Sequence, residues 1–182
     1  MRRSPALLLV TVSALSALGV GLLGPVYPIF VLNRFSASIV DVGFLAAVFS
    51  LTAAVFKAPA GKIVDLVGKE KVLLAGVLLG AISSLSYIYA YNIMHLYLIE
   101  FLFGIAYALQ QPSLLSLAID LSNEEKRGFF LGILSSAYDL AGAVAALVSA
   151  LIVAKFGFEA IFYMASGLHA TTGIFVLKSR KI

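Results

Sequence analysis

Two acidic residues lie inside long apolar stretches, where a charged side chain is costly. Asp139 lies in the run from about 128 to 154, and Glu100 lies in the run from about 94 to 119. An ionised side chain at the centre of a bilayer costs about 2.5–3.5 kcal/mol on insertion scales, so such residues usually face a water-filled path or a partner. We therefore predict that Asp139 and Glu100 are coupling acids for protons or cations. The alternative is interhelical hydrogen bonding that only holds the helices together.

Polar side chains recur at helical spacing around these acids. Glu100, Tyr107 and Gln111 fall on one helical stripe, and Ser135 lies one turn before Asp139. The resulting path is mildly polar and weakly acidic, which favours neutral or cationic solutes. For the two neighbouring glutamines, hydrogen bonding between helices is the stronger alternative. The residues that we expect to line the path are Tyr27, Tyr107, Gln110, Gln111 and Ser135.

The elements that carry these residues are six long apolar runs, which fill the chain from end to end. Each run is near or above the roughly 20 residues that cross a bilayer. The 182 residues are 62% hydrophobic and only 12% charged. Because an open sheet edge is not satisfied in lipid, we predict an all-α membrane protein, a single bundle of six transmembrane helices over 1–182. The runs cover residues 6–32, 38–60, 71–91, 94–119, 128–154 and 158–177.

Basic residues are distributed unevenly between the two ends of these runs. With the N-terminus assigned to the cytoplasm, only Arg34 and Lys155 fall on the other side. This asymmetry predicts a multi-pass protein of the plasma membrane with both termini in the cytoplasm. The net charge of +4 then reflects topology and contact with the lipid bilayer, not a nucleic-acid partner. The cytoplasmic basic residues are Arg2, Arg3, Lys57, Lys62, Lys69, Lys71, Lys126, Arg127, Lys178, Arg180 and Lys181.

Other chemistries have little support. The chain has no cysteine and only two histidines, so we expect no metal site of thiolate or imidazole ligands. The nucleophile motif Gly-x-Ser-x-Gly and the phosphate-binding loop are both absent. Tyr138-Asp139 lacks the second acid that an aspartyl protease dyad needs. We therefore expect neither enzyme activity nor a cofactor.

Two segments have the spacing of helix-capping boxes. Ser38 precedes Asp41 by three residues, and Ser122 precedes Glu125 by three. In such a box the serine oxygen accepts from a free backbone N–H, and the acid accepts from the N–H of the serine. We predict that helices begin at both places.

Small residues at fourfold spacing predict close contacts between helices. Gly76 and Gly80 form one such pair, and Gly128 and Gly132 form another. Small side chains let helix backbones approach closely in a membrane. Since the run 128–154 is the richest in them, we expect it to pack tightly against its neighbours.

A weak internal repeat relates the two halves of the chain. Gly68 and Glu70 precede the third apolar run, and Gly157 and Glu159 precede the sixth in the same register. The two segments are expected on opposite sides of the membrane. This is the arrangement of a 3+3 inverted repeat, which is common in secondary transporters.

The segment between the second and third runs has a distinctive order of glycines and charges. Gly61 and Asp65 are followed by Gly68, Lys69 and Lys71. Glycines allow a tight turn and a close approach of helices. Flanked by lysines, Asp65 is expected to form a compact charge cluster at the headgroup level.

This pattern resembles the signature of the major facilitator superfamily in the cytoplasmic loop between helices 2 and 3. Asp120 and Arg127, at the loop after the fourth run, also resemble that family's N-terminal half. The resemblance implies six of the usual twelve helices, with Asp65 helping to latch the two halves together. Glu100 replaces a frequent arginine and Gly142-Ala143 replaces a Gly-Pro pair, so drug/proton antiport is not implied.

The function implied by this resemblance is secondary active transport of a small solute by alternating access. One bundle supplies only one wall of the expected cavity. A second six-helix bundle is therefore expected, either another copy of the chain or a separate partner chain. The alternatives are a truncated half-transporter without transport of its own and a membrane assembly or regulatory subunit.

Overall fold

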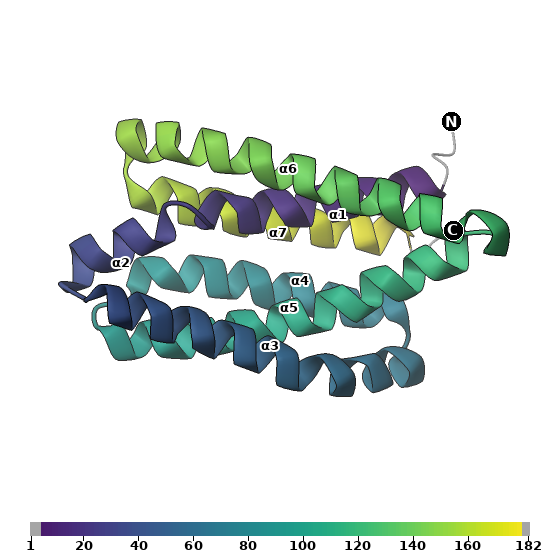
Figure 1. The fold of residues 1–182 in the computed structure, drawn as a ribbon, viewed down its shortest axis with the longest axis horizontal. Coiled ribbons are helices and arrows are strands. Elements are labelled where there is room, and N and C mark those ends of the chain that lie inside the picture. Colours follow the sequence, from purple (N-terminus) through teal and green to yellow (C-terminus); the bar gives the residue numbers. More distant parts are fainter. Residues whose placement is uncertain (1–4, 180–182) are drawn as a thin grey trace.

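The computed structural model describes residues 5–179, and no strand occurs within that range (Figure 1). Six spans are long and apolar enough to cross a membrane, which confirms the predicted fold class. The basic termini at Arg2, Arg3, Arg180 and Lys181 lie outside the described residues. The helices are α1 (Pro5–Leu23), α2 (Tyr27–Phe35), α3 (Ile39–Val67), α4 (Lys69–Ser86), α5 (Ile93–Leu121), α6 (Arg127–Phe156) and α7 (Phe158–Ser179), with short 3-10 turns η1 (Tyr87–Tyr89) and η2 (Glu124–Lys126).

The first span is broken into α1 and α2 by a turn at residues 24–26. Pro25 lies in this turn, and Pro28 occupies the first turn of α2. Proline lacks a backbone N–H, so it disrupts a continuing helix but is tolerated at a helix start. The predicted helix 6–32 is therefore two helices that together cross once.

One of the two predicted capping boxes is present. Ser38 Oγ accepts from the N–H of Asp41 at 3.2 Å, and Asp41 Oδ2 accepts from the N–H of Ser38 at 2.8 Å. The prediction at Ser122 is wrong, because α6 begins only at Arg127. The hydroxyl of Ser122 instead donates to the carbonyl of Ile119 at 2.9 Å, at the end of α5.

The boundary between α3 and α4 also differs from the predicted ranges 38–60 and 71–91. α3 continues to Val67, α4 begins at Lys69, and Gly68 alone separates them with φ +106°. Exposed polar residues do not stop a helix, whereas a backbone in this left-handed region does, and glycine adopts it without strain. The predicted loop residues Gly61 and Asp65 are therefore helical.

The first helix of each half of the chain packs on helices of the other half. α1 packs on α6 and α7, α5 packs on α3 and α4, and α4 meets α7. The first span of each half thus contacts the second and third spans of the other half. This pairing is what the predicted 3+3 inverted repeat requires. α1 begins and α7 ends at the same end of the bundle (Figure 1).

Glycines bring helices together around a buried imidazole. His169 of α7 is fully buried, and its Nδ1 lies 2.9 Å from the carbonyl oxygen of Ala165. A Cβ at Gly19 of α1 would lie 2.6 Å from this ring, and one at Gly80 of α4 would lie 2.7 Å from it. A Cβ at Gly76 would lie 2.9 Å from Gln110. The close packing predicted for Gly76 and Gly80 is therefore confirmed.

The helices α3 and α6 are much less covered than the others. In their most apolar stretches 17% and 11% of residues are buried, against 39–44% in the other four spans. A Cβ at Gly128 or Gly132 would meet no described atom within 4 Å. α6 still approaches α1 closely, because a Cβ at Gly21 would lie 2.9 Å from the backbone of Gly142. The prediction that 128–154 packs tightly is therefore correct where α6 meets α1 and wrong for the other sides of this helix. The two helices lie along opposite edges of the bundle in Figure 1.

Candidate functional site

Two hollows lie along the seam between α1 and α5. The Tyr107 hollow has a volume of 410 Å³ and is walled by α1, α5 and α6. The Glu100 hollow has a volume of 250 Å³ and is walled by α1, α2, α3, α5 and η1. The Tyr107 hollow contacts α1 at Ser13, whereas the Glu100 hollow contacts it at Val20 and Leu23, so the two hollows lie at different depths along one seam.

The Tyr107 hollow gathers three of the predicted path residues, Tyr107, Gln111 and Ser135. Gln110 lies elsewhere, buried against α4, where its Nε2 donates to the carbonyls of Gly76 and Ala106 at 3.2 Å each. This is the interhelical contact that was the stronger alternative for the glutamines. The complete lining is Ser13, Tyr107, Gln111, Leu114, Leu115, Leu131, Leu134, Ser135 and Tyr138.

The Glu100 hollow contains one of the two acids. Glu100 is 5% exposed, and its Oε1 accepts from the hydroxyl of Tyr87 at 2.8 Å. Tyr27 lines the same hollow, with its ring 5.3 Å from that of Tyr87. The buried hydroxyl of Tyr27 has no hydrogen-bond partner within residues 5–179. A carboxyl and two phenols therefore meet in one small apolar chamber.

Asp139 is not part of this cluster. It lies on the exposed side of α6, one turn beyond Ser135, and it forms no hydrogen bond or ion pair with another described residue. The two predicted coupling acids therefore do not meet. Glu100 faces the interior of the bundle, whereas Asp139 lies on a helix that the bundle leaves largely uncovered.

Lys57 is a residue that sequence reasoning misplaced. It was expected to be a charge of a cytoplasmic segment, but it lies within α3, and its Nζ is 5.0 Å from the centre of the Tyr107 ring. The error follows from ending the second helix at residue 60. A lysine within a span of the corrected length is the signal that could have found it.

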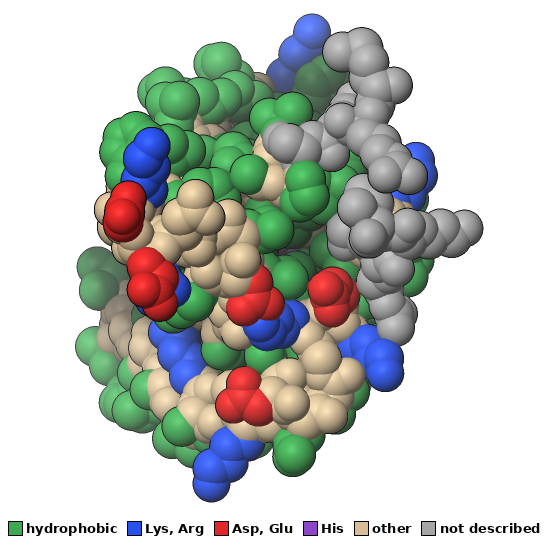
Figure 2. Space-filling model, turned by 90° about the vertical axis from the view of Figure 1, so that its right-hand side faces the viewer, with side chains coloured by type: hydrophobic (Ala, Val, Ile, Leu, Met, Phe, Trp, Pro, Cys, Tyr) green, Lys and Arg blue, Asp and Glu red, His purple; other side chains and the backbone are tan. Residues whose placement is uncertain are grey.

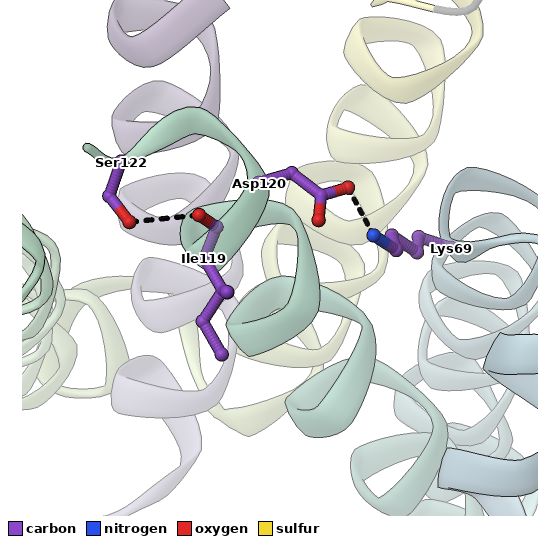
Figure 3. Close-up of polar contacts among 4 residues, drawn as sticks. All are labelled: Lys69, Ile119, Asp120 and Ser122. Atoms are coloured by element: carbon purple, nitrogen blue, oxygen red, sulfur yellow. Dashed lines mark hydrogen bonds and ion pairs between the residues drawn. The ribbon is translucent and has the colours of Figure 1, made fainter. Parts of the chain in front are cut away.

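Acidic and basic side chains gather at one end of the bundle (Figure 2). There, Lys69 at the start of α4 forms an ion pair with Asp120 near the end of α5 (Figure 3). Asp65 is exposed and forms no ion pair with a described residue, so the expected cluster around Asp65 is not formed. Lys71 is also exposed, and a Cβ at Gly61 would face open space.

Arg127 belongs to α6 and not to a loop. It is the first residue of that helix, and its Nε is buried without a hydrogen-bond partner in the described part of the chain. Within residues 5–179, no group of three or more His, Asp or Glu residues could hold a metal ion.

Comparisons with known proteins agree with this architecture. Residues 9–181 match the family model described as Major Facilitator Superfamily. Multidrug resistance protein 2 of Bacillus subtilis is 28% identical over 165 residues, which cover 88% of this chain and 40% of that protein. Inner membrane transport protein YajR of Escherichia coli is 30% identical over 165 residues, which cover 90% of this chain and 36% of that protein.

A solved structure shows the same fold. The in meso crystal structure of the POT family transporter PepTSo matches with a TM-score of 0.86 at 16% sequence identity. The match covers 100% of this chain and 38% of that chain. The chain thus spans about two fifths of the length of the curated relatives it matches.

Proposed function

Because this chain belongs to the Major Facilitator Superfamily, we propose that it is one half of a secondary transporter that moves a small solute by alternating access. The observation that carries the proposal is the seam between α1 and α5, with two hollows that contain polar side chains beside the uncovered helices α3 and α6. Ligand sites in such proteins lie where bundles meet near the middle of the membrane. This seam supplies one wall of such a site.

A second six-helix bundle, either another copy or a separate chain, would cover α3 and α6. Lipid can cover apolar side chains, but it does not satisfy charges near its centre. The uncovered sides of these helices carry Lys57 and Asp139 in addition to large apolar residues such as Leu51 and Leu147. A polar partner surface or a water-filled cavity accounts for both kinds of residue.

The residues of the spans and those of the charged end would have different roles in transport. Glu100 and Asp139 are the candidate coupling acids, because each is a carboxyl within a span. Asp65, left unpaired on α3, would contact the second bundle and latch the two together, while the pair of Lys69 and Asp120 fixes α4 to α5. The chain is a multi-pass membrane protein. We further propose that it lies in the plasma membrane with its charged end in the cytoplasm.

The mass of the assembly in nanodiscs, measured by native mass spectrometry, tests this proposal. We expect two copies, or one copy with a partner of similar size. A monomer under all conditions would contradict a second bundle, and it would favour a half without autonomous transport or a regulatory subunit.

Cysteine cross-linking locates the interface, since the natural chain has no cysteine. Leu147→Cys on α6 should cross-link between chains, and Ile82→Cys on α4 is the matched control, because these side chains are 76% and 61% exposed. Equal cross-linking at both positions would contradict docking on α3 and α6. If the partner is a separate chain, that chain must carry its own introduced cysteine.

A further inference from the structure

Lys57 lies within the span of α3, and its ammonium lies over the ring of Tyr107 in α5. Lys57 lies 10 residues before the end of α3 and Tyr107 lies 14 before the end of α5, which places them about 15 and 21 Å from those ends. Both residues therefore lie well inside their spans, away from the charged end where Lys69 pairs with Asp120.

This ammonium lies beside a chamber that offers hydrogen-bond donors and no acid. Lys57 forms no ion pair with a described residue, and the ring beneath its Nζ is itself part of the chamber wall. Asp139 directly follows the wall residue Tyr138 on α6, but it is exposed and is not part of the lining. The polar side chains of the lining are Ser13, Tyr107, Gln111, Ser135 and Tyr138, and the rest are leucines.

We propose that Lys57 and the Tyr107 hollow bind the anionic group, such as a carboxylate, of a small organic solute. Hydroxyl and amide donors stabilise an anion, and an ammonium adds charge-assisted hydrogen bonds in a site of low dielectric. The leucines would hold a short apolar body, and 410 Å³ suits a small molecule. The inference rests on the proposed transporter function and specifies its substrate class.

The proposal reverses the sequence-based expectation of neutral or cationic solutes. That expectation assigned Glu100 and Asp139 to one weakly acidic path. In the structure Glu100 lies in a separate chamber, Asp139 lies outside the lining of the Tyr107 hollow, and the Lys57 ammonium lies over the ring of the wall residue Tyr107.

Fluorine NMR of fluorotyrosine-labelled protein in nanodiscs of neutral lipid tests the site, with Tyr107→Phe identifying the signal among eight tyrosines. The probes are butanoate, butanamide and butylammonium, which match in size and differ in charge. We expect a saturable shift of the Tyr107 signal with butanoate alone. Lys57→Gln should weaken it by about tenfold or more, which is the loss expected for a charge-assisted hydrogen bond. Lys57→Arg should retain binding.

Lys62→Gln is the matched control, because Lys62 is exposed on the same helix but nearer the charged end. It removes the same charge and should leave butanoate binding unchanged. Equal responses to butanoate and butanamide, equal losses in both glutamine variants, or no saturable shift would each overturn the site. Circular dichroism verifies that the variants fold.

The same measurements separate this inference from the proposed function. If Lys57→Gln changes the mass of the assembly and not the butanoate shift, Lys57 pairs with an acid of the second bundle, and the anion site is wrong. If the wild-type chain is monomeric but binds butanoate, the second bundle is contradicted and the site stands.

Discussion

Removing the hydroxyl of Tyr87 tests whether the contact with Glu100 stabilises the bundle. Tyr87→Phe keeps the ring, which is 2% exposed and stacks on Phe162 with centroids 5.2 Å apart. Only the donor at 2.8 Å from Glu100 Oε1 is lost. Leaving a buried acceptor without its partner costs about 1–3 kcal/mol. Hydrogen bonds between membrane helices average about 0.6 kcal/mol and reach about 1.7.

We expect Tyr87→Phe to lower the free energy of unfolding by about 1–1.7 kcal/mol, where these two ranges overlap. The unpartnered hydroxyl of Tyr27 lies in the same hollow and would replace part of the lost contact. Tyr27→Phe combined with Tyr87→Phe should therefore cost more than the sum of the single changes. Such coupling is expected of residues that share a partner.

Denaturant unfolding in detergent, followed by circular dichroism, measures both quantities. Tyr89→Phe is the control, because Tyr89 lies two residues away in the same 3-10 turn and is 70% exposed. It should change the free energy of unfolding by less than about 0.5 kcal/mol, as surface substitutions usually do. An equal effect of Tyr87→Phe and Tyr89→Phe would refute a stabilising contact with Glu100.

Three further tests concern other parts of the structure. Gly80→Ala should destabilise by about 1–3 kcal/mol through overpacking against the buried imidazole, whereas Gly132→Ala, with open space around it, should be neutral or stabilising; thermal unfolding of both measures the difference. A double-mutant cycle of Lys69→Gln and Asp120→Asn should give a coupling energy of at most about 1 kcal/mol, because the side chains are 27% and 55% exposed, and a larger value would contradict this. Asp139→Asn should abolish coupled uptake by the assembled transporter while the fold is retained, and full uptake in vesicles would contradict its role as a coupling acid.

The spans were predictable because hydropathy and length alone determine them in a bilayer. The residues at which helices begin and end were predictable only where a local side chain caps the helix. Ser38 and Asp41 form their capping box, but the same spacing at Ser122 fails, since the chain first makes a 3-10 turn before α6 begins. The pattern that caps a helix is also compatible with the end of the preceding one.

The lining of the seam was only partly predictable, since it depends on how helices turn relative to one another. Periodicity correctly grouped Tyr107 with Gln111, because both lie on one helix. The sequence-based prediction also assigned Tyr27 and Tyr107 to one path and left out Lys57, because contacts between helices are not visible in the spacing along one helix. Side-chain direction across an interface follows from packing, which the sequence specifies only collectively.

The inverted repeat explains why the seam holds two chambers and not one. The repeat makes the first span equivalent to α5 and makes α3 equivalent to α6. This agrees with the packing, in which the first span of each half contacts the second and third spans of the other half. The Tyr107 hollow lies between α1, α5 and α6, and the Glu100 hollow lies between the first span, α5 and α3. Each repeat thus builds an equivalent chamber at a different depth. Because the sequences differ, one chamber has a buried carboxyl and the other has a neighbouring ammonium. A solute site and a proton site can therefore coexist on one seam while remaining chemically distinct.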